Sequence, residues 1–165
     1  MNALRDKVIV AATLWLLVLA AHIDSSAEVL RLKLDDQITP ASAEVIVSAI
    51  TRAERDRAAA LVILLNTPGG LETSMREIVS RIIASRVPVI VYVAPSGSRA
   101  ASAGFIILLA ADVAAMVPGT ATGAAHPLLI GGGEMSKTMT EKVVNDASAY
   151  VRSLAEKRNR DPQAA

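Results

Sequence analysis

Cysteine is absent from this chain, which excludes disulfide bonds, thiolate catalysis and cysteine-ligated metal sites. Histidine occurs only twice, at His22 and His126, so a serine–histidine mechanism has few candidate bases. Aromatic residues make up 2% of the chain, and a core must therefore come from Ala, Val, Ile and Leu, as in layered α/β proteins. The net charge of +1 gives no electrostatic basis for binding nucleic acid.

The first 27 residues have the pattern of a secretion leader. Arg5 and Lys7 precede an apolar run over 8–21 that only Thr13 interrupts, and small residues follow at 25–27. This run is shorter than the ~20 residues that a transmembrane helix needs. We therefore expect a signal peptide or N-terminal membrane anchor over 1–27 and one domain over 28–165.

The remaining chain alternates between strand and helix patterns. Apolar, β-branched runs predict strands over 29–34, 60–65, 87–93 and 113–117. Helices are predicted after Thr39-Pro40, over 71–84, from about residue 100 to 111, and from Met139 to about Lys157, where Thr138 and Glu141 have capping-box spacing. A long glycine-containing loop is expected over 118–137. Such alternation predicts an α/β fold with a largely parallel sheet.

Ser102 lies where the third predicted strand turns into an apolar helix. Small residues surround it over 95–104, and Phe105–Ala110 continues the helix that Ala100–Ala103 would begin. A serine at such a turn exposes its hydroxyl beside backbone N–H groups and the positive end of a helix, which is a geometry suited to acyl transfer. An equally good interpretation is that the small residues only allow the helix to pack closely.

Two further features have both a chemical and an ordinary interpretation. Gly69 and Gly70 follow a predicted strand and could present N–H groups to an anion, although a plain β–α turn is the more common meaning of Pro-Gly-Gly. The Lys-Ser/Thr pair of a phosphate-binding loop does not follow them. Lys142 lies in the first turn of the last predicted helix and could be a general base, whereas a solvated lysine is the more frequent case.

Several segments taken together resemble the NfeD family. They are 66–71 (Asn-Thr-Pro-Gly-Gly-Leu), 96–104 (Ser-Gly-Ser-Arg-Ala-Ala-Ser-Ala-Gly), 116–120 (Met-Val-Pro-Gly-Thr), 142–147 (Lys-Val-Val-Asn-Asp-Ala) and 150–155 (Tyr-Val-Arg-Ser-Leu-Ala). The resemblance spans roughly 29–161. Its serine and lysine blocks, in order and forty positions apart, are far more specific together than either alone.

This resemblance implies a membrane-associated serine protease of the ClpP class, with the ClpP/crotonase-like spiral of βαβ units. Ser102 would be the nucleophile and Lys142 the general base, while the N–H groups of Gly70 and Ala103 would bind the oxyanion. The family implies an ATP-independent endopeptidase on the extracytoplasmic side of the membrane, without a cofactor or metal. Its substrates would be hydrophobic segments of membrane-associated proteins such as stomatin-like partners, and the chain would form a homodimer.

Alternatives to this interpretation remain. His126, which precedes a proline, resembles the catalytic histidine of ClpP in its distance from the serine and is an alternative base. A catalytically silent scaffold for a membrane protein is a third hypothesis. An acyl-CoA hydratase of the same fold would need a carboxylate base and no serine at the turn, which is the reverse of this sequence. The family's protease domain continues beyond the lysine helix, so we expect 28–165 to be C-terminally incomplete.

Overall fold

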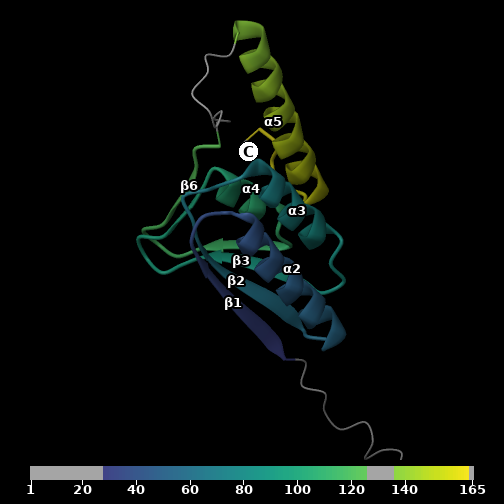
Figure 1. Cartoon of the computed structure of the whole chain (residues 1–165). Coiled ribbons are helices and arrows are strands. Elements are labelled where there is room, and N and C mark those ends of the chain that lie inside the picture. The colour runs from purple at the N-terminus through teal and green to yellow at the C-terminus, as the bar shows by residue number, and fades with distance from the viewer. Residues whose placement is uncertain (1–27, 126–135, 164–165) are drawn as a thin grey trace, which may run out of the picture.

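The computed structural model describes residues 28–125 and 136–163, so the expected leader and His126 lie outside the described residues. In chain order the elements are β1 (Val29–Asp35), α2 (Pro40–Arg55), β2 (Ala60–Asn66), α3 (Glu72–Ile83), β3 (Val89–Val93), β4 (Arg99–Ala101), α4 (Ala103–Ala110), β5 (Val113–Met116), β6 (Ala121–Gly123) and α5 (Lys137–Lys157) (Figure 1). None of the helices in these ranges is long and apolar enough to cross a membrane.

Four strands form one parallel sheet in the order β1-β2-β3-β5. Helices α2 and α3 connect successive strands, and α4 leads into β5, as expected for βαβ units. The four predicted strands and the parallel sheet are thus confirmed. All four strands end on the same side of the sheet, and the loops that follow them gather there.

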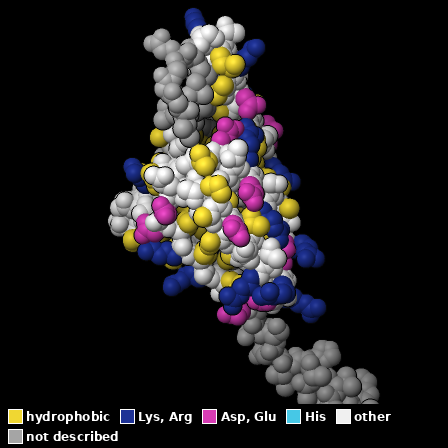
Figure 2. Space-filling model, in the orientation of Figure 1, with side chains coloured by type: hydrophobic (Ala, Val, Ile, Leu, Met, Phe, Trp, Pro, Cys, Tyr) yellow, Lys and Arg dark blue, Asp and Glu magenta, His cyan; other side chains and the backbone are white. Residues whose placement is uncertain are grey.

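One face of the sheet forms the core. Leu61, Ile63 and Leu65 of β2 alternate inward and are aligned with Val89, Val91 and Val93 of β3. Helix α3 lies between α2 and α4, and the three helices cover this face (Figure 1). Residues on the opposite face, such as Val62 and Tyr92, are only half-buried in the described part of the chain. Figure 2 shows acidic and basic side chains interspersed over the visible surface, in keeping with the small net charge.

The short strand β4 replaces the predicted start of the helix before Ser102. Residues 99–101 pair in parallel with β6, inside the segment expected to be loop. On the other side, the Thr67 N–H donates to the Arg99 carbonyl at 2.7 Å, and the Ala101 N–H donates to the Thr67 carbonyl at 3.1 Å. The prediction was wrong because these long-range hydrogen bonds outweigh the intrinsic helix preference of the alanines.

Helix α5 begins earlier than the sequence predicts. Ser136, rather than Thr138, is the N-cap, and its side chain accepts a hydrogen bond from the Met139 N–H at 3.3 Å. Only the C-terminal half of the helix is buried against the domain, through Val151, Leu154 and Ala155. The N-terminal half extends beyond the body of the domain (Figure 1).

Two arginines anchor the end of α5 to the end of α4. Arg158 donates to the Ala110 carbonyl at 2.6 Å and to the Asp112 carboxylate at 2.5 Å. Arg160 donates to the carbonyls of Leu109 and, at 3.0 Å, Ala111. The last carbonyls of a helix lack partners within the helix, so these guanidinium groups satisfy acceptors that would otherwise be left open.

We expect Arg158→Ala to lower the free energy of unfolding by about 2 kcal/mol, because hydrogen bonds to charged groups contribute ~1.5–3 kcal/mol each. The exposed Arg152 on the same helix is the matched control, and Arg152→Ala should change stability by less than about 0.5 kcal/mol. Urea denaturation of both variants measures the difference. Equal stabilities would contradict the anchoring role.

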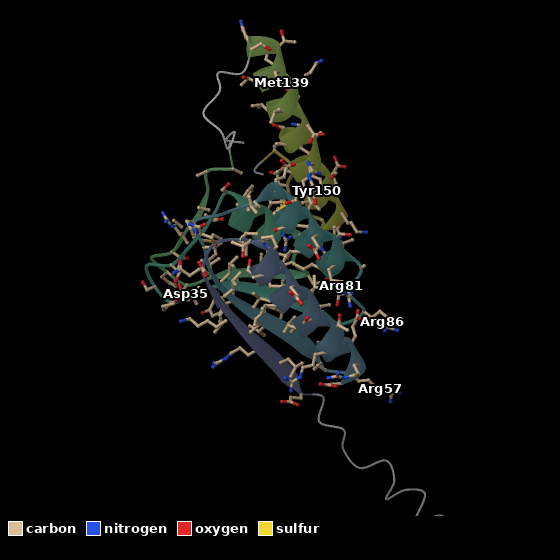
Figure 3. The ribbon with its side chains drawn as sticks, viewed as in Figure 1. Asp35, Arg57, Arg81, Arg86, Met139 and Tyr150 are labelled. Atoms are coloured by element: carbon tan, nitrogen blue, oxygen red, sulfur yellow. The ribbon has the colours of Figure 1, made fainter. Side chains whose placement is uncertain are left out.

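Glu54 holds the C-terminal end of α2 to α3 and to the turn that follows α3. Its carboxylate accepts from Arg81 at 2.6 and 3.2 Å and from the Arg86 backbone N–H at 3.0 Å. The Arg81 hydrogen bond, followed by that from the Arg86 backbone, lowers the pKa of Glu54 to about 2. Arg81 and Arg86 are labelled at this end of the helix layer in Figure 3.

This depressed pKa makes the contribution of Glu54 depend on pH. The ionised carboxylate contributes its full stabilisation above the ordinary glutamate pKa, and that stabilisation is lost as the pH falls through about 2. Glu54→Gln should therefore be less stable than wild type at pH 7, with a difference that shrinks between about pH 5 and pH 2. The exposed Glu44 provides the control Glu44→Gln, and urea titrations across this pH range give the comparison. A pH-independent difference would refute the assignment.

Candidate active site

Ser102 occupies an unusual backbone conformation at the junction of β4 and α4. Its φ is 52° and its ψ is −117°, and it forms the N-cap of α4 without capping the helix through its side chain. A non-glycine residue in this region costs of order 1–3 kcal/mol and persists only where its surroundings enforce it. Here the Ser102 N–H donates to the Gly123 carbonyl at 2.8 Å, and the Ser102 carbonyl accepts from Phe105 at 3.0 Å. Ser102 therefore lies at a strand-to-helix turn, as predicted, but the strand before it is β4 and not the predicted strand over 87–93.

The Gly69-Gly70 loop lies directly against this serine. A Cβ placed on Gly69 would lie 2.7 Å from Ser102 Cβ and 3.3 Å from its Oγ. The φ of Gly69 is +108°, a value that favours glycine. A Cβ on Gly70 would lie 2.1 Å from the Ile38 carbonyl oxygen, so this position also excludes a side chain. Pro-Gly-Gly is therefore more than a plain turn, because its two glycines allow the loop to pack against Ser102 and Ile38.

The Gly70 N–H, which follows Gly69 in the chain, and the Ala103 N–H, which follows Ser102, have no partner within the described ranges. The Ile38 N–H donates to the Gly69 carbonyl, and the Ile38 carbonyl accepts from the Leu71 N–H. Neither bond uses the Gly70 N–H, which lies between them in the chain. The Ala103 N–H opens α4 and is likewise without an acceptor among the described residues. A free N–H at a helix start, such as that of Ala103, carries partial positive charge, and free backbone N–H groups in general suit a developing oxyanion.

Thr67 connects the glycine loop to the serine turn and was missed by the sequence analysis. Its side chain is fully buried, and its hydroxyl accepts from the Gly69 N–H at 3.1 Å. Its backbone bonds to both Arg99 and Ala101. A Cβ on Gly104 would approach Thr67 Cγ2 to 2.4 Å, so the start of α4 packs directly on this threonine. The sequence feature that could have indicated this role is a threonine between an apolar strand and Pro-Gly-Gly.

Asn66 supports the same junction from the edge. Its amide nitrogen donates to Asp35 at 2.8 Å, and its amide oxygen accepts from the Arg99 N–H at 2.9 Å. Hydrogen bonds from Lys33 and then from Asn66 lower the pKa of Asp35. A carboxylate at position 66 would face Asp35 with like charge and could not donate, which explains why an amide suits this position.

Lys142 lies on the projecting half of α5 and is exposed. Within the described part of the chain, no hydrogen bond or ion pair joins it to Ser102. The structure therefore places Gly69, the neighbour of Gly70, against Ser102, with Ala103 next in the chain. It places Lys142 on a helix that joins the same body further along. No cluster of three or more His, Asp or Glu side chains suited to a metal occurs in residues 28–125 and 136–163.

This parallel βαβ sheet, with a serine turn facing a glycine loop, defines a ClpP-like α/β domain. The chain belongs to the NfeD family, because residues 28–165 match the family described as NfeD1b, N-terminal domain. The family expected from the sequence is therefore confirmed.

The chain is 39% identical over 156 residues to the membrane-bound protease PH1510 of Pyrococcus horikoshii. That similarity covers 93% of this chain but 35% of the relative, so the chain spans about a third of its length.

Two similar solved structures are mutants of a 1510-N membrane-bound stomatin-specific protease. A serine-to-alanine mutant has a TM-score of 0.78 at 37% identity, covering 86% of this chain and 69% of that one. A lysine-to-alanine mutant in complex with a substrate peptide has a TM-score of 0.77 at 37% identity, covering 86% and 65%.

Gly69→Ala tests how closely the loop and Ser102 are packed. Gly97 is the matched control, because it also has a positive φ but a Cβ added there would meet nothing within 4 Å. Gly97→Ala should cost about 1 kcal/mol in stability from backbone strain alone. Gly69→Ala should cost ~1–3 kcal/mol more from overlap with Ser102. Equal losses in chemical denaturation would show that the loop does not abut the serine.

Proposed function

We propose that residues 28–165 are the protease part of a membrane-associated, ATP-independent serine endopeptidase with a Ser102–Lys142 dyad. The observation that carries the proposal is the backbone of Ser102, which is held at a positive φ with its hydroxyl beside Gly69. An enforced conformation of this kind at a strand-to-helix turn is typical of an exposed serine nucleophile.

Catalysis would begin with attack by Ser102 Oγ on the carbonyl carbon of the scissile peptide bond. Lys142, as a neutral amine, would take the serine proton and then deliver it to the leaving amine. The N–H groups of Gly70 and Ala103 would hold the negative oxygen, and the loss of one such donor typically costs ~100- to 1,000-fold in rate. Water would then hydrolyse the acyl-enzyme with Lys142 again acting as the base.

The proposed base must move into hydrogen-bond reach of Ser102 when substrate binds, since catalytic hydrogen bonds often form only in the substrate complex. Its support comes from the relatives, in which a serine and a lysine were each replaced by alanine. Those two residues are one position further apart in the relative than Ser102 and Lys142 are here.

The same relatives support a proposal for the substrate class. Both solved structures are of a protease specific for stomatin, and one holds a substrate peptide. We propose that this chain cleaves hydrophobic segments of a stomatin-like membrane protein. We further propose that it acts as a homodimer on the extracytoplasmic side of the membrane.

The decisive experiment compares wild type with Ser102→Ala, Lys142→Ala and His126→Ala in the full chain. Two measurements are needed: labelling by a fluorophosphonate probe and cleavage of a hydrophobic peptide. Ser102→Ala should lose both activities entirely, and Lys142→Ala should lose ~100- to 10,000-fold in cleavage rate. His126→Ala should keep most of its activity.

The other outcomes identify the alternatives. An inactive His126→Ala beside an active Lys142→Ala would make the site a Ser102–His126 pair. A folded wild-type chain that neither labels nor cleaves would instead support a non-catalytic scaffold. Circular dichroism of each variant establishes that the fold is retained.

A further inference from the structure

Lys142 lies beyond the last point at which α5 is held to the domain. All residues from Ser136 to Lys142 are exposed, including Met139 near the tip of the helix (Figure 3). The helix is held at its C-terminal end by Arg158 and Arg160. Between these two regions, Arg76 of α3 contacts the middle of α5.

Arg76 is the centre of a cluster with Glu72, Asp146 and Tyr150. Its guanidinium donates to the Asp146 carboxylate at 3.0 Å and lies 4.4 Å from the centre of the Tyr150 ring. It also donates to Glu72, one turn earlier on α3, at 2.8 Å. Figure 3 shows Tyr150 where α5 meets the body of the domain. A guanidinium can hold a carboxylate and stack on a ring at the same time, which an ammonium does less well.

The position of this cluster relates it to the proposed chemistry. Asp146 follows Lys142 by four residues and therefore lies one turn away on the same face of α5. Helix α3 begins two residues after Gly70, so Arg76 belongs to the element that leads out of the glycine loop. Arg76 thus connects the helix that follows the proposed oxyanion loop to the helix that carries the proposed base.

We propose that Arg76 is a positioning residue that sets where Lys142 lies relative to Ser102. This inference rests on the proposed Ser–Lys function. Without Arg76, α5 would lose its hydrogen bond to α3 through Asp146, and the segment with Lys142 would sample a wider range of positions. A displacement of about 1 Å at a reacting group can cost ~100-fold in rate.

The test measures the rate at which the full chain reacts with a fluorophosphonate probe. Arg76→Ala should react at least about tenfold more slowly than wild type, and Arg76→Lys should recover part of the loss. Asp146→Asn, a change at an exposed side chain, should give a smaller loss of about threefold. The control Arg52→Ala breaks an exposed ion pair between Arg52 of α2 and Asp56, the residue that follows this helix, and should leave the rate unchanged.

A double-mutant cycle separates positioning from a general loss of structure. If Arg76 acts through Lys142, adding Arg76→Ala to Lys142→Ala should slow the residual labelling no further. An equal fold-loss in both backgrounds would overturn the inference, as would a wild-type labelling rate in both Arg76→Ala and Asp146→Asn. Full labelling by Lys142→Ala would refute the proposed base as well. Slow labelling by Lys142→Ala with normal labelling by the Arg76 and Asp146 variants would refute only the inference.

Discussion

The site depends on backbone hydrogen bonds that hold residues 99–102 from two sides. Thr67 pairs with Arg99 and Ala101 on one side, and β6 pairs with the same stretch on the other, up to the bond from Ser102 to Gly123. Without these bonds, the alanines could continue α4 by another turn, and Ser102 would relax into an ordinary helical conformation. The same Thr67 fixes the Gly69 N–H, so one residue sets both the serine turn and the loop opposite it.

The two halves of the proposed dyad are held by different kinds of interaction. Ser102 is fixed by short backbone bonds and by the fully apolar helix α4, whose residues are nearly all buried. The helix with Lys142 is held by Val151 and Leu154 together with three arginines, and the residues of its first turns up to Lys142 are exposed. Rigid nucleophile geometry is therefore built into the core, whereas the base lies on a helix whose position depends on side-chain contacts at the surface.

The arginine contacts differ in exposure and hence in strength. Arg158 is largely buried and binds helix-end carbonyls together with Asp112, so it supports the fold itself. Arg76 is more exposed, and its partner Asp146 is mostly in solvent. An exposed ion pair adds little to stability, but it can still restrict where a projecting helix lies. A residue can therefore matter more for positioning than for folding.

The sequence alone determined the four strands, the helices between them, the serine turn and the glycine loop. These features follow from the spacing of apolar residues and from the glycine and proline residues at turns, which are local properties of the chain. Several short segments, in the right order, also indicated the family to which the chain belongs. Only the tertiary structure decided that 99–101 is a strand, that Asn66 bridges Asp35 and Arg99, and that Arg158 caps α4. These features join residues 20 or more positions apart in sequence, and such pairing depends on how the layers pack rather than on any local pattern.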